Sequence, residues 1–254
     1  MTVPVPSSTD QRSGAARPLA TEVAVALSYN GSTEAVLMAS PTDLIDFAYG
    51  FSLTEGLATP QQIERIEPLV TPLGIDLQIW VSEEVAGRLA ARRRRRVGPV
   101  GCGLCGIETL AEAMRGLPQL PATPLRLSDT EAEAAVATLD AAQPLRDATR
   151  ATHAAGFWTP AEGLVALRED VGRHNALDKL AGALRGRDPP AGAVVLTSRV
   201  SVDLVQKCVT LGAPLLLAVS APTTAAVDAA RAAGLMLAAP VRRGRVDWLS
   251  RGEG

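Results

Sequence analysis

The alternation of apolar and smaller residues predicts a hairpin near the start of the chain. Apolar residues alternate from Val23 to Leu27, and a second run of this kind ends at Met38. Asn30-Gly31 lies between the two runs, and both residues tolerate the positive φ angles that a type I′ turn requires. A two-stranded hairpin is therefore expected at residues 23–38.

Helical spacing of apolar residues follows the hairpin. Ser40-Pro41-Thr42-Asp43 predicts a helix start with Ser40 as the cap, and an apolar stripe runs from Leu44 to Phe51. A strand is expected from Leu73 to Val81, with Leu73 on its apolar face. A second helix is expected from Ser82 to the arginines at 92–96.

The second half of the chain alternates short apolar runs with amphipathic ones. Strands are expected at 163–167, 193–197 and 215–219, and helices at 175–184 with Asn175 as a cap, from Ser201 onward, and at 222–233. This alternation predicts an α/β layered sheet with mostly parallel connections. The expected division is a flexible tail at 1–20, an N-terminal α+β part at 21–124 and an α/β ligand-binding part at 125–254.

Composition narrows the class of protein. The 254 residues are 47% hydrophobic and 3% aromatic, so the core must consist mainly of alanine, valine and leucine. A net charge of −2 argues against a general nucleic-acid binder. Three cysteines do not form a secreted disulfide framework, and no apolar run has the length of a signal peptide or a membrane span. We expect a soluble cytoplasmic protein that binds neither nucleic acid nor membrane.

The thiol pair Cys102 and Cys105 in V-G-C-G-L-C-G-I is the leading candidate for chemistry. Glycines beside each sulfur leave room for a reactant, and the thiolate form is the nucleophile. The arginines at 92–96 either form a solvated helix end or attract an anion. Four functions fit the pair: a structural zinc site, a thiol-disulfide oxidoreductase, a zinc deaminase and a persulfide carrier.

The rest of the chain limits two of these alternatives. Zinc needs further ligands, and only the distant Cys208, His153 and His174 could supply them, so no metal site is expected. A deaminase needs a histidine or cysteine before the thiol pair, and the chain has none there. Cys208 shares the apolar side of its helix and is expected in the core.

Polar segments after the predicted strands form a second candidate site. The run from Arg168 to Asn175 includes Arg173 and His174, and Thr197–Ser201 includes Arg199. Val219–Thr224 repeats this strand-to-helix pattern. Helix starts at such strand ends favour anions, so a nucleotide-like ligand is expected along this edge. A basic loop at 242–245 lies near the end of the chain.

Long motifs give the chain a resemblance to a known family. They are C-G-L-C-G, H-A-A at His153, and the stretches 41–56, 169–180, 198–207 and 218–223. Together they resemble the formate dehydrogenase accessory sulfurtransferases, the FdhD family, from about Glu22 to Arg245. Departures occur at Arg150 and Ala151, where the family commonly has small residues, and at Ala239 and Pro240, where it often has an aromatic residue and glycine.

The resemblance implies a fold like that of cytidine deaminases and a homodimeric sulfur carrier. Such a protein takes sulfur from a cysteine desulfurase as a cysteine persulfide and passes it to the molybdenum bis-guanine-dinucleotide cofactor of formate dehydrogenase. By motif position, Cys102 would carry the persulfide and Cys105 would assist. The alternatives are a nucleotide-cofactor chaperone without sulfur transfer and a thiol-disulfide oxidoreductase. The expected cofactor-contacting residues are Ala239, Pro240, Val241, Arg242, Arg243, Gly244, Arg199, Arg173 and His174.

Overall fold

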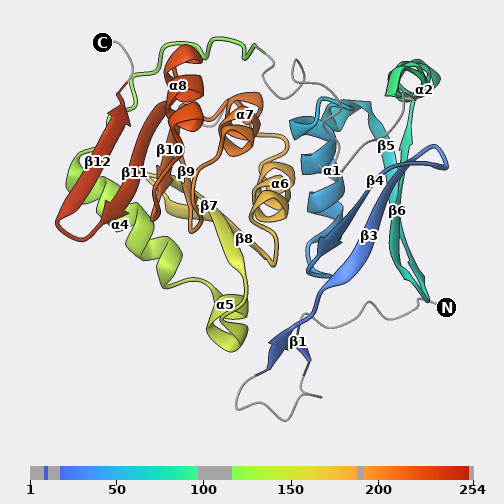
Figure 1. Cartoon of the computed structure of the whole chain (residues 1–254), viewed down its shortest axis with the longest axis horizontal. Coiled ribbons are helices and arrows are strands. Elements are labelled where there is room, and N and C mark those ends of the chain that lie inside the picture. Colours follow the sequence, from blue (N-terminus) through green and yellow to red (C-terminus); the bar gives the residue numbers. More distant parts are fainter. Residues whose placement is uncertain (1–8, 11–17, 97–115, 188–191, 252–254) are drawn as a thin grey trace.

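The computed structural model describes residues 9–10, 18–96, 116–187 and 192–251, and in these ranges it contains two main sheets with helices between them (Figure 1). The sequence-based prediction of an α/β protein is confirmed at this level. A two-residue pairing of β1 (Thr9–Asp10) with β2 (Leu19–Ala20) lies within the segment expected to be a tail.

The smaller sheet has four strands in the order β4-β3-β6-β5. The hairpin is confirmed: Tyr29 pairs with Ser32, and Asn30 and Gly31 have φ angles of 45° and 78°. Two helices pack on one face, where the inward side chains of the strands form an apolar core. The elements are β3 (Val23–Tyr29), β4 (Ser32–Ala39), α1 (Leu44–Thr54), η1 (Pro60–Gln62), β5 (Ile63–Thr71), β6 (Gly74–Val81) and α2 (Glu83–Arg96).

The larger sheet has six strands in the order β12-β11-β10-β9-β7-β8. Helices α6, α7 and α8 cover one face and α4 covers the other, so strand residues alternate between two apolar clusters. Successive elements are α4 (Asp129–Asp140), α5 (Pro144–Thr149), β7 (His153–Thr159), β8 (Gly163–Asp170), α6 (Arg173–Ala183), β9 (Ala193–Leu196), α7 (Val202–Leu211), β10 (Leu215–Ala218), α8 (Thr224–Ala232), β11 (Met236–Arg242) and β12 (Arg245–Ser250).

The strand pairing corrects the expectation of a mostly parallel sheet. Only β9-β10 and β10-β11 are parallel, whereas β7 runs antiparallel to both of its neighbours and β12 runs antiparallel to β11. Short turns connect β7 to β8 and β11 to β12, and such turns permit antiparallel pairing without a crossover helix. The sheet is therefore mixed, with a parallel centre.

Two predicted helix starts were wrong. Helix α1 begins at Leu44 after Asp43, and buried Ser40 instead accepts a hydrogen bond from the Val171 amide. Helix α6 begins after Gly172, and the amide of Asn175 donates to the Met38 carbonyl and the Asp170 carboxylate. Both side chains satisfy polar groups of another segment, which outweighs their local capping preference.

Leu73 was also placed wrongly in the sequence-based strand. It lies in the turn before β6 and is 91% exposed, whereas Ile75, Leu77 and Ile79 are buried. Strand β6 therefore begins one residue later, and its antiparallel partner β5 ends just before this turn.

Helices α1 and α6 cross closely between the two sheets (Figure 1). A Cβ atom on Gly50 would overlap the carbonyl oxygen of Asp178, and one on Gly182 would overlap the carbonyl oxygen of Asp46. Glycine at both crossing positions lets the two backbones touch, so this contact fixes how the halves of the chain meet.

Buried ion pairs surround that crossing. The Lys179 ammonium lies 2.6 Å from the Asp170 carboxylate and donates to the Ser40 carbonyl. The Lys207 ammonium contacts Asp178 at 2.8 Å and Glu55 at 2.6 Å. These are the only lysines in the sequence, and both join the N-terminal half to the C-terminal half.

Candidate functional site

The ends of the central strands bring several predicted polar segments to one edge of the larger sheet. Thr197 follows β9, Val219 follows β10 and Val241 lies near the end of β11. His153 begins the antiparallel β7 at this same edge and pairs with Asp170. The expectation that these strand ends share a rim is therefore confirmed.

Two adjoining cavities open along this edge. An inner cavity of about 290 Å³ is lined partly by Arg146, His153 and Thr197. An outer cavity of about 610 Å³ is lined partly by Arg242 and Arg243. Both cavities share the lining residues Val136, Asp140 and Val219. We call the two together the edge groove; its size is in the range of small-molecule sites.

The predicted basic loop is a tight turn at the mouth of the groove. Arg242 pairs with Arg245 across it, and Gly244 has a φ of 75°. The Gly244 amide donates to the Glu133 carboxylate of α4 at 3.1 Å, which anchors the turn. Arg242 and Arg243 are exposed and line the outer cavity, as an anion-binding role requires.

Most of the other residues expected to contact the cofactor in this loop do not line the groove. Ala239 and Val241 are buried strand residues, and of Ala239, Pro240, Val241 and Gly244 only Val241 lines the groove. Their contribution is to hold the turn in place rather than to present polar groups.

None of Arg173, His174 and Arg199 lines either cavity of the edge groove. Arg173 opens α6 and Arg199 is exposed. The imidazole Nε2 of His174 contacts the carboxylate of Asp203 in the first turn of α7. Burial raises the pKa of Asp203, but hydrogen bonds from His174 and Ser201 outweigh that effect and hold the pKa well below its usual range.

His153 is half-buried where it lines the inner cavity. Burial lowers the pKa of its imidazole, and the nearby Arg173 and His174 lower it further. A neutral imidazole has one donor and one acceptor nitrogen, so His153 can hydrogen-bond an uncharged ligand group at neutral pH.

We expect His153 to titrate below pH 6.5 in the folded protein. The unfolded chain then binds this proton more readily than the folded chain, so His153 lowers stability as the pH falls below 6.5. An NMR titration checks this directly, because the sequence has two histidines and His153→Gln identifies the missing signal. A midpoint at or above 6.5 for His153 would contradict the environment described.

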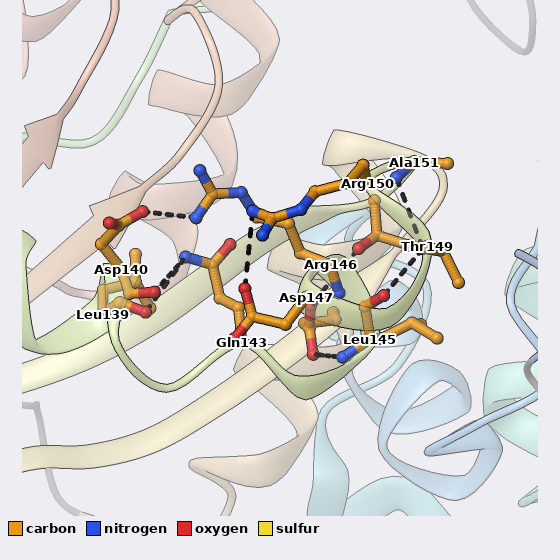
Figure 2. Close-up of polar contacts among 11 residues, drawn as sticks. Leu139, Asp140, Gln143, Leu145, Arg146, Asp147, Thr149, Arg150 and Ala151 are labelled. Carbon is orange, nitrogen blue, oxygen red and sulfur yellow. Dashed lines mark hydrogen bonds and ion pairs between the residues drawn. The ribbon is translucent and has the colours of Figure 1, made fainter. Parts of the chain in front are cut away.

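Sequence reasoning missed Asp140 and Arg146, which form an ion pair in the groove (Figure 2). Asp140 ends α4, whose buried stripe of Ala132, Ala135 and Leu139 has too little contrast to predict a helix from periodicity. The capping box formed by Ser128 and Glu131 was the available signal.

Two residues of the polar run before α6, which the sequence analysis assigned to a ligand site, instead hold the fold together. Glu169 is buried and accepts hydrogen bonds from the amides of Leu145 and Arg146, at 2.8 and 2.7 Å. It thereby holds the start of α5. Asp170 is fully buried and binds Lys179.

Cys102 and Cys105 lie outside the described residues, so the geometry of the thiol pair is not part of this structure. Before them, Arg88 and Arg92 of α2 donate to the carbonyls of Leu57 and Glu55. This part of α2 thus attaches to the segment after α1. Cys208 is fully buried as predicted, and burial raises the pKa of its thiol to about 12.

No helix in the described ranges combines the length and apolarity needed to cross a bilayer. In those same ranges, histidine, cysteine and acidic side chains form no cluster of three or more that could hold a metal ion.

Comparison with known proteins assigns the chain to a family. The model of the FdhD/NarQ family matches residues 20–253. The sulfur carrier protein FdhD of Agrobacterium fabrum is 53% identical over 87% of this chain and 83% of its own length. That of Bordetella petrii is 47% identical over 88% of this chain and 81% of its own length.

A solved structure agrees with this assignment. The crystal structure of a Desulfotalea psychrophila protein, provisionally described as a formate dehydrogenase accessory protein, has a TM-score of 0.71 and 25% identity. The similarity covers 92% of this chain and 89% of the other. On the extent of these matches, the chain belongs to the FdhD/NarQ family.

Proposed function

We propose that the protein is a sulfur carrier for the maturation of formate dehydrogenase. It accepts sulfur from a cysteine desulfurase as a persulfide on Cys102, assisted by Cys105. It then passes the sulfur to the molybdenum bis-guanine-dinucleotide cofactor as acceptor, and it acts in the cytoplasm as a homodimer. The observation that carries this proposal is the family match with relatives named sulfur carrier, in a chain with a glycine-flanked thiol pair.

The loading step is a thiol exchange. The Cys102 thiolate attacks the terminal sulfur of the donor persulfide, and a new S–S bond forms at Cys102. The S–S bond of the donor breaks, and the donor cysteine leaves as a thiolate that takes up a proton. The sulfur atom moves without an external oxidant or reductant.

The edge groove suits the acceptor. Arg242 and Arg243 offer positive charge for its phosphates, and Ala134, Ala137 and Val241 offer an apolar wall for its uncharged parts. Arginine forms strong bidentate hydrogen bonds with phosphate oxygens. The proposed orientation therefore has the phosphates at the hairpin turn and the rest of the ligand deeper in the groove.

Mass spectrometry after incubation with a cysteine desulfurase and cysteine tests the loading step. The intact protein and Cys208→Ala should each gain one sulfur atom, whereas Cys102→Ala should gain none. Cys208→Ala is the matched control because its thiol is fully buried. Added sulfur that remains in Cys102→Ala and in the double variant with Cys105→Ala would refute the assignment.

The same spectra distinguish the alternatives. A chaperone without sulfur transfer would bind guanine nucleotides and gain no sulfur. A thiol-disulfide oxidoreductase would instead lose two hydrogen atoms as Cys102 and Cys105 join.

A further inference from the structure

The geometry points to Asp140 and Arg146 as a pair that recognises the 2-amino-4-oxopyrimidine edge of a ligand. This ring edge carries an amino group, a ring N–H and a carbonyl oxygen in a row, and guanine and pterins share it. The inference rests on the proposed function because it takes the edge groove as the acceptor site. It adds that Asp140 and Arg146 form hydrogen bonds with the ring of the acceptor.

The pair stands at the junction of the two cavities. Asp140 ends α4 and Arg146 lies on α5 (Figure 2). Asp140 lines both cavities, and Arg146 lines the inner one. The Asp140 side chain is 64% exposed and that of Arg146 is 34% exposed. Both groups are thus accessible to a ligand that enters from the outer cavity.

The ion pair leaves hydrogen-bonding capacity unused. It joins Oδ1 of Asp140 to Nη1 of Arg146. Within the described part of the chain, Oδ2 of Asp140 and the Nε and Nη2 groups of Arg146 form no hydrogen bond. A carboxylate has about four acceptor positions and a guanidinium five N–H groups, so acceptors and donors remain side by side.

This arrangement is complementary to the proposed ring edge. The amino group and the ring N–H can both donate to the Asp140 carboxylate, and the ring carbonyl can accept from Arg146. Adenine has no such pair of adjacent donors, and it can offer the carboxylate only its single exocyclic amino group. His153, which also lines the inner cavity, offers a further uncharged partner.

The surrounding structure holds the pair in position. Glu169 fixes the amides of Leu145 and Arg146 at the start of α5. Buried Gln143 donates from its amide to the Leu139 carbonyl at 3.1 Å, which ties the end of α4 to this turn. A site positioned before the ligand arrives loses less conformational entropy on binding.

Equilibrium binding of GDP, IDP and ADP to the full-length protein tests the inference. IDP lacks the amino group of GDP, so we expect affinities in the order GDP, IDP, ADP. Asp140→Asn replaces an acceptor oxygen by a donor amide and should weaken GDP binding about tenfold or more, with little change for ADP. The Tm of Asp140→Asn should be close to that of the wild type, because the carboxylate is exposed.

Asp147→Asn is the matched control. Like Asp140, Asp147 is an exposed aspartate that pairs with an arginine, in this case Arg150 at 3.6 Å (Figure 2). It lies in α5 and lines neither cavity. Its affinity for GDP should equal that of the wild type. Equal affinities for GDP and ADP in the wild type, or equal losses in the two variants, would overturn the inference.

Two further measurements separate the ligand sources and the two proposals. If 6-hydroxymethylpterin displaces GDP from the wild type but not from Asp140→Asn, the pair reads the pterin edge; if it does not, the pair reads guanine. Arg243→Glu tests the groove itself. If Arg243→Glu loses GDP binding and Asp140→Asn binds GDP fully, ring recognition by Asp140 and Arg146 is refuted, but the edge groove remains the acceptor site. If both variants bind GDP fully, the edge groove is not the acceptor site.

Discussion

Replacing Gly182 by alanine should destabilise the folded protein by about 3 kcal/mol or more. The added methyl group would overlap the carbonyl oxygen and backbone carbon of Asp46 in α1. A flexible side chain could move aside, but these are backbone atoms of a packed helix. The two helices would have to separate, and the buried ion pairs beside them would lengthen.

Urea unfolding followed by circular dichroism measures this loss. Gly87→Ala is a suitable control because Gly87 lies in helix α2, is exposed and has no atom within 4 Å of an added Cβ. Alanine favours helix over glycine, so the control should gain roughly 0.5–1 kcal/mol. If Gly182→Ala were as stable as the wild type, the close crossing of α1 and α6 would be wrong.

Replacing Lys179 by methionine should cost about 3–5 kcal/mol, because it leaves the Asp170 carboxylate buried without its cation. Both side chains are completely buried, and Asp170 also accepts from the amides of Ser40 and Gly172. Burial lowers the pKa of Lys179, and the attraction of Asp170 opposes that shift. The attraction of Asp170 thus favours the charged form of Lys179 against the cost of burial.

An exposed pair provides the comparison for this variant. Arg187 and Glu162 lie 3.4 Å apart with side chains 47% and 57% exposed, so Arg187→Met should cost less than about 1 kcal/mol. The double variant of Lys179→Met with Asp170→Asn should recover part of the loss, because it removes the stranded charge. Similar unfolding free energies for Lys179→Met and Arg187→Met would contradict a buried ion pair.

Local sequence signals predicted the hairpin and the buried central strands well. Asn30-Gly31 needs only its own backbone preferences, and the runs at β9 and β10 are apolar throughout. Helix α4 was missed because its buried face is mostly alanine. Strand β5 was missed because its residues are mainly exposed at one edge of the sheet.

The candidate site was predictable only in part, for a physical reason. Arg242 and Arg243 form a basic turn that is recognisable in the sequence, and both line the outer cavity. Glu169 and Asp170 are as polar in the sequence as the groove arginines, yet each is buried against a partner on another segment of the chain. Pattern alone does not distinguish a buried carboxylate from a ligand-binding one, because the difference lies in tertiary contacts.

One departure from the family pattern, Arg150, falls at a residue with a left-handed backbone conformation. Its φ of 58° at the end of α5 is a conformation that glycine adopts without steric cost. Arginine there costs roughly 1–2 kcal/mol.

The burial of both lysines has a consequence for chemical modification. Acylating reagents attack the free, uncharged amine, and here each ammonium group is enclosed by carboxylates inside the folded protein. Amine-directed fluorophores and cross-linkers thus have no lysine to react with on the described surface while the two halves stay together. Lysine acylation therefore requires the two halves to separate, and its rate measures how often they do so.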